Sequence, residues 1–174
     1  MRRAAILSLL ILISVPAFAE DRTAPGAGSR RARDFVYEDV NPNSPTHGQS
    51  LSLSKLYSER GVVLNFIASW CGYCWKELPE LQELYANETA SIVGVAADEY
   101  DGSGRLLQLV EQARVTIPIL LVPKDDIAAM ERDYNHRILP ATYVIDKRGS
   151  IRRVFQGLAP LDELLKEIRT NLGS

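Results

Sequence analysis

The strongest constraint on the fold is a nearly continuous apolar run at residues 62–68, followed closely by a helical pattern at residues 72–87. Such a run is typical of a strand buried on both faces of a sheet, and leucines at helical spacing predict an amphipathic helix after it. The same reasoning gives strands at 35–40, 51–53, 92–97, 117–122, 141–145 and 151–155, and helices at 106–114, 126–134 and 161–171. Strands that alternate with helices predict an α/β fold with a largely parallel sheet, to which the final hairpin adds antiparallel strands.

The N-terminal residues 1–19 have the layout of a secretory signal peptide. A basic start precedes an apolar run and the small-residue pattern Ala17-Phe18-Ala19. The apolar run is shorter than the roughly 20 residues of a membrane-spanning helix, although an uncleaved anchor remains an alternative. Residues 20–34 are rich in Pro, Gly and charge and predict a flexible linker, which leaves residues 35–174 as one domain. We therefore expect an exported, periplasmic protein.

Charge and cysteine content exclude several classes of function. A formal net charge of -2 argues against a nucleic-acid partner held by bulk electrostatics. Two cysteines are too few for a disulfide-dense scaffold or a four-cysteine zinc site. In an oxidising compartment, such a pair is expected to form a disulfide.

The two cysteines occur as Cys71-Gly72-Tyr73-Cys74, where the buried strand gives way to the helix. Unpaired N–H groups and the positive end of the helix dipole stabilise a thiolate at Cys71, which predicts that Cys71 is the attacking sulfur. Cys74 lies one turn later and would resolve the mixed disulfide. The alternatives are an inert disulfide, which would stabilise little across so short a loop, and half of a zinc site, for which further ligands are missing.

The segment from Trp70 to Cys74 with Pro79 after it, and the segment 138–146 around Pro140, resemble the thioredoxin superfamily. Together with the strand 63–66 and the expected export, they resemble its TlpA/ResA-like branch of extracytoplasmic thiol-disulfide oxidoreductases, which includes proteins of cytochrome c maturation. The resemblance spans residues 35–172. It implies a thioredoxin fold, with a mixed central sheet flanked by helices, an N-terminal strand extension and an inserted βα unit at 117–134.

The resemblance also implies catalytic roles beyond Cys71 and Cys74. Pro140 matches the cis-proline beside the disulfide, although an ordinary trans-proline would also suit the start of a strand. Glu77 matches an acid beneath the cysteines, which would have a raised pKa and move protons for Cys74 if buried, whereas the alternative is a solvent-facing carboxylate. Asn65 stands where cytoplasmic thioredoxins carry a buried acid, and we expect the backbone to satisfy its side chain.

Substrate binding is expected around the cysteines. Trp70, Tyr73 and Leu139 are the candidate contact residues, with core packing as the alternative for Trp70 and Leu139. Trp75 is bulkier than the residue usual after the second cysteine and is expected to alter the partner surface. Tyr73 replaces a common proline, which leaves the redox potential open because the intervening residues tune thiolate stability.

The expected function is reduction of disulfides in exported proteins that carry CxxC pairs, such as apocytochrome c or copper-site proteins. A membrane electron donor of the thiol-disulfide type would regenerate the dithiol, and we expect a monomer with no cofactor and no metal. One alternative is a disulfide oxidant or isomerase, although the large helical insertion of oxidant relatives is not evident here. Another is a copper-binding chaperone that uses His136 together with Cys71 and Cys74.

Overall fold

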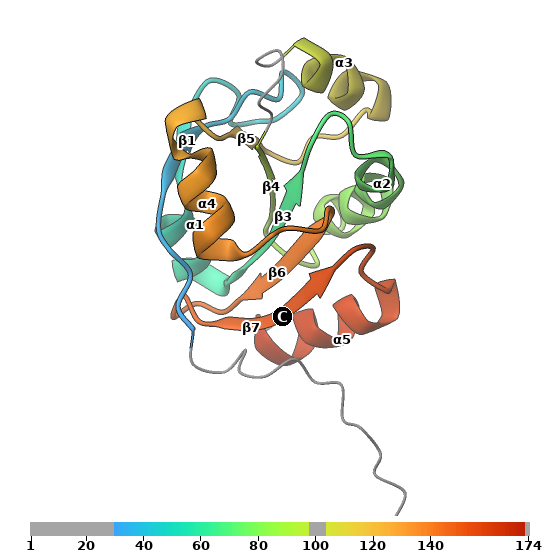
Figure 1. Cartoon of the computed structure of the whole chain (residues 1–174). Helices are drawn as coiled ribbons and strands as arrows, with labels where there is room; N and C mark the ends of the chain where they lie inside the picture. Colours follow the sequence, from blue (N-terminus) through green and yellow to red (C-terminus); the bar gives the residue numbers. More distant parts are fainter. Residues whose placement is uncertain (1–29, 98–103, 173–174) are drawn as a thin grey trace, which may run out of the picture.

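The computed structural model describes residues 30–97 and 104–172, so the expected signal peptide and residues 20–29 lie outside the described part. The elements are β1 (Val36–Glu38), β2 (Ser50–Ser52), α1 (Leu53–Arg60), β3 (Val62–Ile67), α2 (Gly72–Ala86), β4 (Ile92–Ala96), α3 (Gly104–Ala113), β5 (Ile119–Leu121), a 3-10 turn η1 (Lys124–Asp126), α4 (Ile127–Tyr134), β6 (Ala141–Ile145), β7 (Ile151–Gln156) and α5 (Leu161–Asn171). A five-stranded sheet has the order β5-β4-β3-β6-β7, and β1 and β2 form a separate antiparallel pair (Figure 1).

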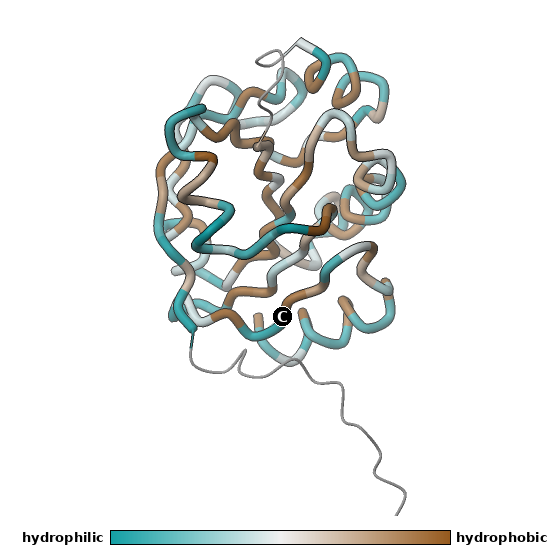
Figure 2. Tube along the Cα trace, viewed as in Figure 1, coloured by the Kyte–Doolittle hydropathy of each residue, from teal (hydrophilic) through white to brown (hydrophobic). Residues whose placement is uncertain are grey.

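The central strand β3 separates two hydrophobic clusters, because its side chains alternate between the two faces of the sheet. Val63 and Ile67 join residues of α2, α3 and α5 in one cluster. Leu64 and Phe66 join residues of α4 and β1 in the other. Figure 2 shows the hydrophobic residues gathered on the central strands. Helices therefore cover both faces, which explains why the sequence of β3 is apolar almost throughout.

The pairing of the strands confirms the expected mixed sheet. β3 is parallel to β4 and antiparallel to β6. β4 is in turn parallel to β5, and β7 is antiparallel to β6. The inserted unit at 117–134 appears as β5, η1 and α4. The α/β fold class expected from the sequence is thus confirmed.

One helix was not expected. α1 begins directly after β2, at Leu53, which the sequence had assigned to a strand. The Ser52 hydroxyl caps this helix by accepting the N–H of Lys55. Leu53, Leu56 and Tyr57 have helical spacing, but the segment is too short for this pattern to stand out. No helix within the described residues has both the length and the apolar character needed to cross a membrane.

Residues 30–34, which were expected to belong to the linker, lie against the domain. The N–H of Ala32 donates to the carbonyl of Gly149 in the β6–β7 turn at 2.8 Å. The guanidinium of Arg33 donates to both carboxylate oxygens of Asp126, at 2.9 and 3.1 Å. Residues 30–34 therefore already belong to the folded domain, beside the β6–β7 turn.

Candidate active site

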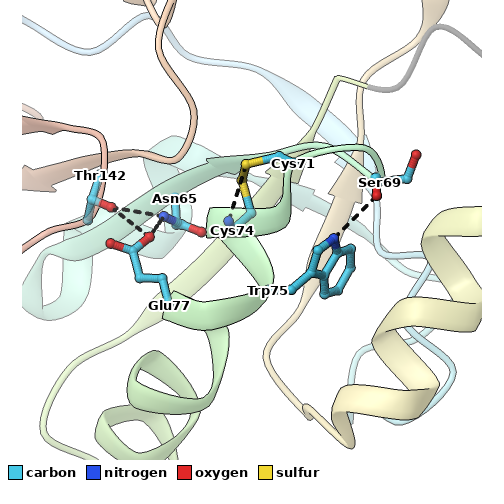
Figure 3. Close-up of a disulfide and its surroundings, with 7 residues drawn as sticks. All are labelled: Asn65, Ser69, Cys71, Cys74, Trp75, Glu77 and Thr142. Carbon is cyan, nitrogen blue, oxygen red and sulfur yellow. Dashed lines mark hydrogen bonds between the residues drawn. A yellow bond between two sulfur atoms is a disulfide. The ribbon is translucent and has the colours of Figure 1, made fainter.

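Cys71 and Cys74 form a disulfide at the N-terminus of α2 (Figure 3). Cys71 is the N-cap residue, and its Sγ accepts a hydrogen bond from the N–H of Cys74 at 3.2 Å. The Cys71 side retains 6% exposure, whereas Cys74 has none. The helix end places partial positive charge at Cys71, which favours a thiolate there after reduction. The two sulfurs are therefore unequal, with Cys71 the one nearer to solvent.

Aromatic side chains are exposed next to the disulfide. Trp70 and Tyr73 are each 60% exposed, in contrast to the buried cysteines that each of them precedes. The Nζ of Lys76 lies 5.1 Å from the Tyr73 ring centroid. Two exposed aromatic rings that flank a disulfide offer apolar contact area to a protein partner.

Pro140 and Leu139 form the next part of the site. The Leu139–Pro140 peptide is cis, and Pro140 directly precedes β6. Ala141, the first residue of β6, pairs with Phe66 near the end of β3, from which the chain continues to Cys71. Leu139 is half-buried and packs against both hydrophobic clusters. Leu139 also shares with Trp70 the lining of an open pocket of about 310 Å³.

Glu77 is buried on the sheet side of α2, one turn after Cys74, and is only 2% exposed. Its Oε1 accepts the backbone N–H of Ala159 at 2.8 Å, and its Oε2 accepts the Nδ2–H of Asn65 at 2.8 Å. The hydroxyl of Thr142 lies 3.5 Å from the same Oε2. Burial raises the pKa of the Glu77 carboxyl, although these hydrogen bonds oppose the shift. A buried carboxyl with a raised pKa near a dithiol is suited to accept and return a proton.

Asn65 contradicts the expectation that the backbone satisfies its side chain. Its Nδ2 donates to Glu77 and, at 2.8 Å, to the Oγ1 of Thr142, the cross-strand neighbour in β6. Asn65 and Thr142 project from adjacent strands onto the α2 face of the sheet, between the hydrophobic residues of that cluster. Thr142 and Ala159 were not predicted as site residues from the sequence. A polar residue inside the apolar strand 141–145 was the available signal for Thr142.

Trp75 and His136 pack partly or wholly into the domain, unlike the exposed Trp70 and Tyr73. Trp75 packs partly against the core, and its indole N–H donates to the Ser69 carbonyl at 3.3 Å, so it braces the loop before Cys71. His136 is buried and stacks on Phe66, with the ring centroids 4.3 Å apart. Burial lowers the pKa of His136. Within residues 30–97 and 104–172, no three His, Cys, Asp or Glu side chains are grouped to hold a metal, so His136 is not brought together with the two cysteines.

Comparison with known proteins agrees with this geometry. The model of the AhpC/TSA family matches residues 29–154. The thiol-disulfide oxidoreductase ResA of Oceanobacillus iheyensis is 31% identical over 163 residues, which are 90% of this chain and 81% of the relative. ResA of Geobacillus kaustophilus is 30% identical over 176 residues, covering 98% of this chain and 94% of the relative. A putative thiol:disulfide interchange protein DsbE from Chlorobium tepidum shares the fold, with a TM-score of 0.68, 24% identity, and coverage of 84% and 98% of the two chains.

Proposed function

Because this chain belongs to the AhpC/TSA family and is a thiol-disulfide oxidoreductase of the thioredoxin fold, we propose that it acts in the periplasm as a reductant of disulfides in exported proteins. The observation that carries this proposal is the unequal placement of the two sulfurs. Cys71 caps a helix and retains exposure, whereas Cys74 is enclosed. Such a pair is suited to let a partner sulfur approach Cys71 while the resolving thiol stays out of reach.

The proposed reaction transfers two electrons from the Cys71–Cys74 dithiol to a substrate disulfide. The Cys71 thiolate attacks one substrate sulfur, forms a mixed disulfide and releases the other substrate sulfur as a thiolate. Cys74 then loses its proton and attacks the Sγ of Cys71, which forms the enzyme disulfide and releases the second substrate thiolate. The buried Glu77 carboxylate is the proposed acceptor of the Cys74 proton, which one of the two product thiolates ultimately takes up.

The proposed partners follow from the surroundings of the disulfide and from the N-terminal sequence. Trp70, Tyr73 and Leu139 would contact a segment of the substrate beside its CxxC pair, and the backbone before Pro140 would pair with it as an added strand. The signal-like residues 1–19 support export. Apocytochrome c and copper-site proteins are the substrate classes we favour. A dithiol donor in the membrane would regenerate the enzyme, which we expect to act as a monomer.

Trapping tests the catalytic role. Cys74→Ser removes the resolving thiol, so the mixed disulfide with an exported CxxC protein should accumulate and be released by dithiothreitol. The matched variant Cys71→Ser should capture nothing. If Cys74→Ser also captures nothing while its Cys71 is alkylated readily, the proposal is wrong.

The reduction potential of the Cys71–Cys74 pair tests the direction of transfer. The adjacent Trp70 provides a fluorescence signal for an equilibrium titration against a dithiol of known potential. A value near that of thioredoxin, about -270 mV, agrees with a reductant. A value near about -120 mV would identify a disulfide oxidant instead.

A further inference from the structure

The Asn65 amide in the sheet beneath α2 has an oxygen without a hydrogen-bond donor. Both hydrogens of Nδ2 are used, one on the Oε2 of Glu77 and one on the Oγ1 of Thr142. The Oδ1 is enclosed and has no partner in the described part of the chain, and the whole residue is only 1% exposed. Buried side-chain oxygens without a donor are rare in folded proteins. The amide lies with its nitrogen toward the Glu77 carboxyl, which in its ionised form can only accept a hydrogen bond.

Cys74 is placed to supply the missing donor. It precedes Glu77 by three residues in α2, so both side chains project from the same face of the helix. Glu77 contacts Asn65 from this face, and Figure 3 shows the amide nitrogen of Asn65 on the Glu77 side and its oxygen on the Cys74 side. In the disulfide the Cys74 sulfur carries no hydrogen. The Asn65 oxygen is therefore unpaired in the oxidation state that the structure represents.

We propose that in the dithiol form the Cys74 thiol donates a hydrogen bond to the Oδ1 of Asn65, which makes Asn65 a positioning residue for the second half of the reaction. The amide neither gains nor loses a proton. The Asn65 amide binds the Cys74 thiol through its Oδ1 and the Glu77 carboxylate through its Nδ2. This inference rests on the proposed function only in requiring that the pair cycles through the dithiol.

The consequence is that the two sulfurs differ in protonation in the reduced protein. The Sγ of Cys71 already accepts the N–H of Cys74, an arrangement that favours a negative sulfur. The Sγ of Cys74 faces an acceptor, which favours a sulfur that keeps its hydrogen. The proton of the reduced pair therefore resides on Cys74 while Cys71 attacks.

Infrared spectroscopy tests the hydrogen bond directly. The chain has two cysteines, so Cys71→Ala leaves a single S–H, whose stretching band lies apart from other protein absorption. The band should lie at the lower frequency and higher intensity of a hydrogen-bonded thiol. Adding Asn65→Leu, which has a similar shape but no oxygen, should move it to the frequency of a free thiol. A free-thiol band in Cys71→Ala itself, or no change on adding Asn65→Leu, would overturn the proposal.

Thr142→Val is the matched control in the Cys71→Ala background. The Thr142 hydroxyl bonds the same nitrogen of Asn65 and the same oxygen of Glu77, but it lies on the far side of the amide from Cys74 (Figure 3). This variant should leave the S–H band in place. Because Cys71→Ala cannot turn over, the result is independent of whether the trapping experiment succeeds.

A second measurement does not depend on whether Asn65→Leu folds. In the unsubstituted protein, the side-chain ¹³Cγ resonance of Asn65 should move on reduction, as its oxygen gains a hydrogen bond, whereas the side chain of the exposed Asn43 should not respond. An unchanged Asn65 resonance would contradict the proposal. Where Asn65→Leu does fold with both cysteines present, losing one hydrogen bond should destabilise its dithiol about five- to tenfold relative to the disulfide.

Discussion

The Oε1 of Glu77 accepts the backbone N–H of Ala159 at 2.8 Å, across 82 positions of sequence. This contact fastens the helix that carries the disulfide to the loop before α5. The other oxygen of the same carboxyl is bonded to β3 through Asn65. One buried acid thus joins three separate parts of the domain beneath the cysteines, and its protonation state affects all of them.

Glu77→Gln should flatten the dependence of stability on pH. Burial raises the pKa of Glu77 in the folded state above its ordinary value of 4.5, so between the two pKa values the folded chain binds more protons than the unfolded chain. The free energy of unfolding therefore falls as pH rises through this window, by up to about 1.4 kcal/mol per pH unit. Urea denaturation from pH 4.5 upward would measure the slope. Exposed Glu83 on the same helix provides the control Glu83→Gln, which should keep the slope of the unsubstituted protein.

His136→Phe should reduce the loss of stability that the protein undergoes as pH falls below 6.5. Burial lowers the pKa of His136 below its ordinary value of 6.5, so the unfolded chain takes up a proton first as pH falls. Stability from this residue is thus present above pH 6.5 and is lost as pH falls below it. Phenylalanine keeps a ring to stack on Phe66 and cannot titrate. Melting temperatures between pH 7 and pH 5 should show a smaller decline than in the unsubstituted protein, whereas His47→Gln, at an exposed position, should not change the decline.

Asp126→Asn should loosen the N-terminal segment. The Asp126 carboxylate accepts hydrogen bonds from Arg33 and from the Tyr37 hydroxyl, and both partners precede α1. Because the ion pair is partly exposed, we expect a loss of about 1 kcal/mol in the free energy of unfolding. Hydrogen exchange should accelerate in residues 31–39 ahead of the rest of the domain. Glu163→Gln breaks the more exposed pair with Arg153 and should cost about 0–0.5 kcal/mol without affecting that segment.

Gly61→Ala should be strongly destabilising. Gly61 has a φ of 84° at the junction of α1 and β3, and an added Cβ would lie 2.7 Å from the Ile145 carbonyl oxygen and 2.6 Å from the Cδ2 of Leu172. Overpacking and a positive φ together predict a loss of about 2 kcal/mol or more by chemical denaturation. Gly157 has the same φ of 84° but open space around its Cα, so Gly157→Ala isolates the backbone cost and should lose less. Equal losses in the two variants would mean that the contacts at Gly61 yield easily.

The sequence predicts the long elements of this fold better than the short ones. The strand 62–68 and the helix 72–87 correspond closely to β3 and α2, because their apolar patterns are unbroken over several turns or pleats. α1 was missed because three apolar residues in eight do not separate a helix from the end of a strand. β5 is shorter than the expected strand 117–122, because its ladder with β4 extends only over residues 119–121.

Only part of the candidate site could be predicted from the sequence pattern. The position of Cys71 and Cys74 at the start of a helix follows from local sequence alone. The cluster of Asn65, Glu77 and Thr142 does not, because it depends on the register of β3 against β6 and on the rotation of α2 above them. The expectation that the backbone satisfies Asn65 was wrong for this reason.

The entry point of the chain and the disulfide lie at opposite poles of the sheet. Arg30 adjoins the β6–β7 turn, which follows Ile145, whereas Cys71 follows the end of β3 that pairs with Ala141. The point where the N-terminal segment meets the domain and the reactive disulfide therefore occupy opposite ends of the structure. A label attached at Arg30 would therefore leave the disulfide free to meet a protein partner.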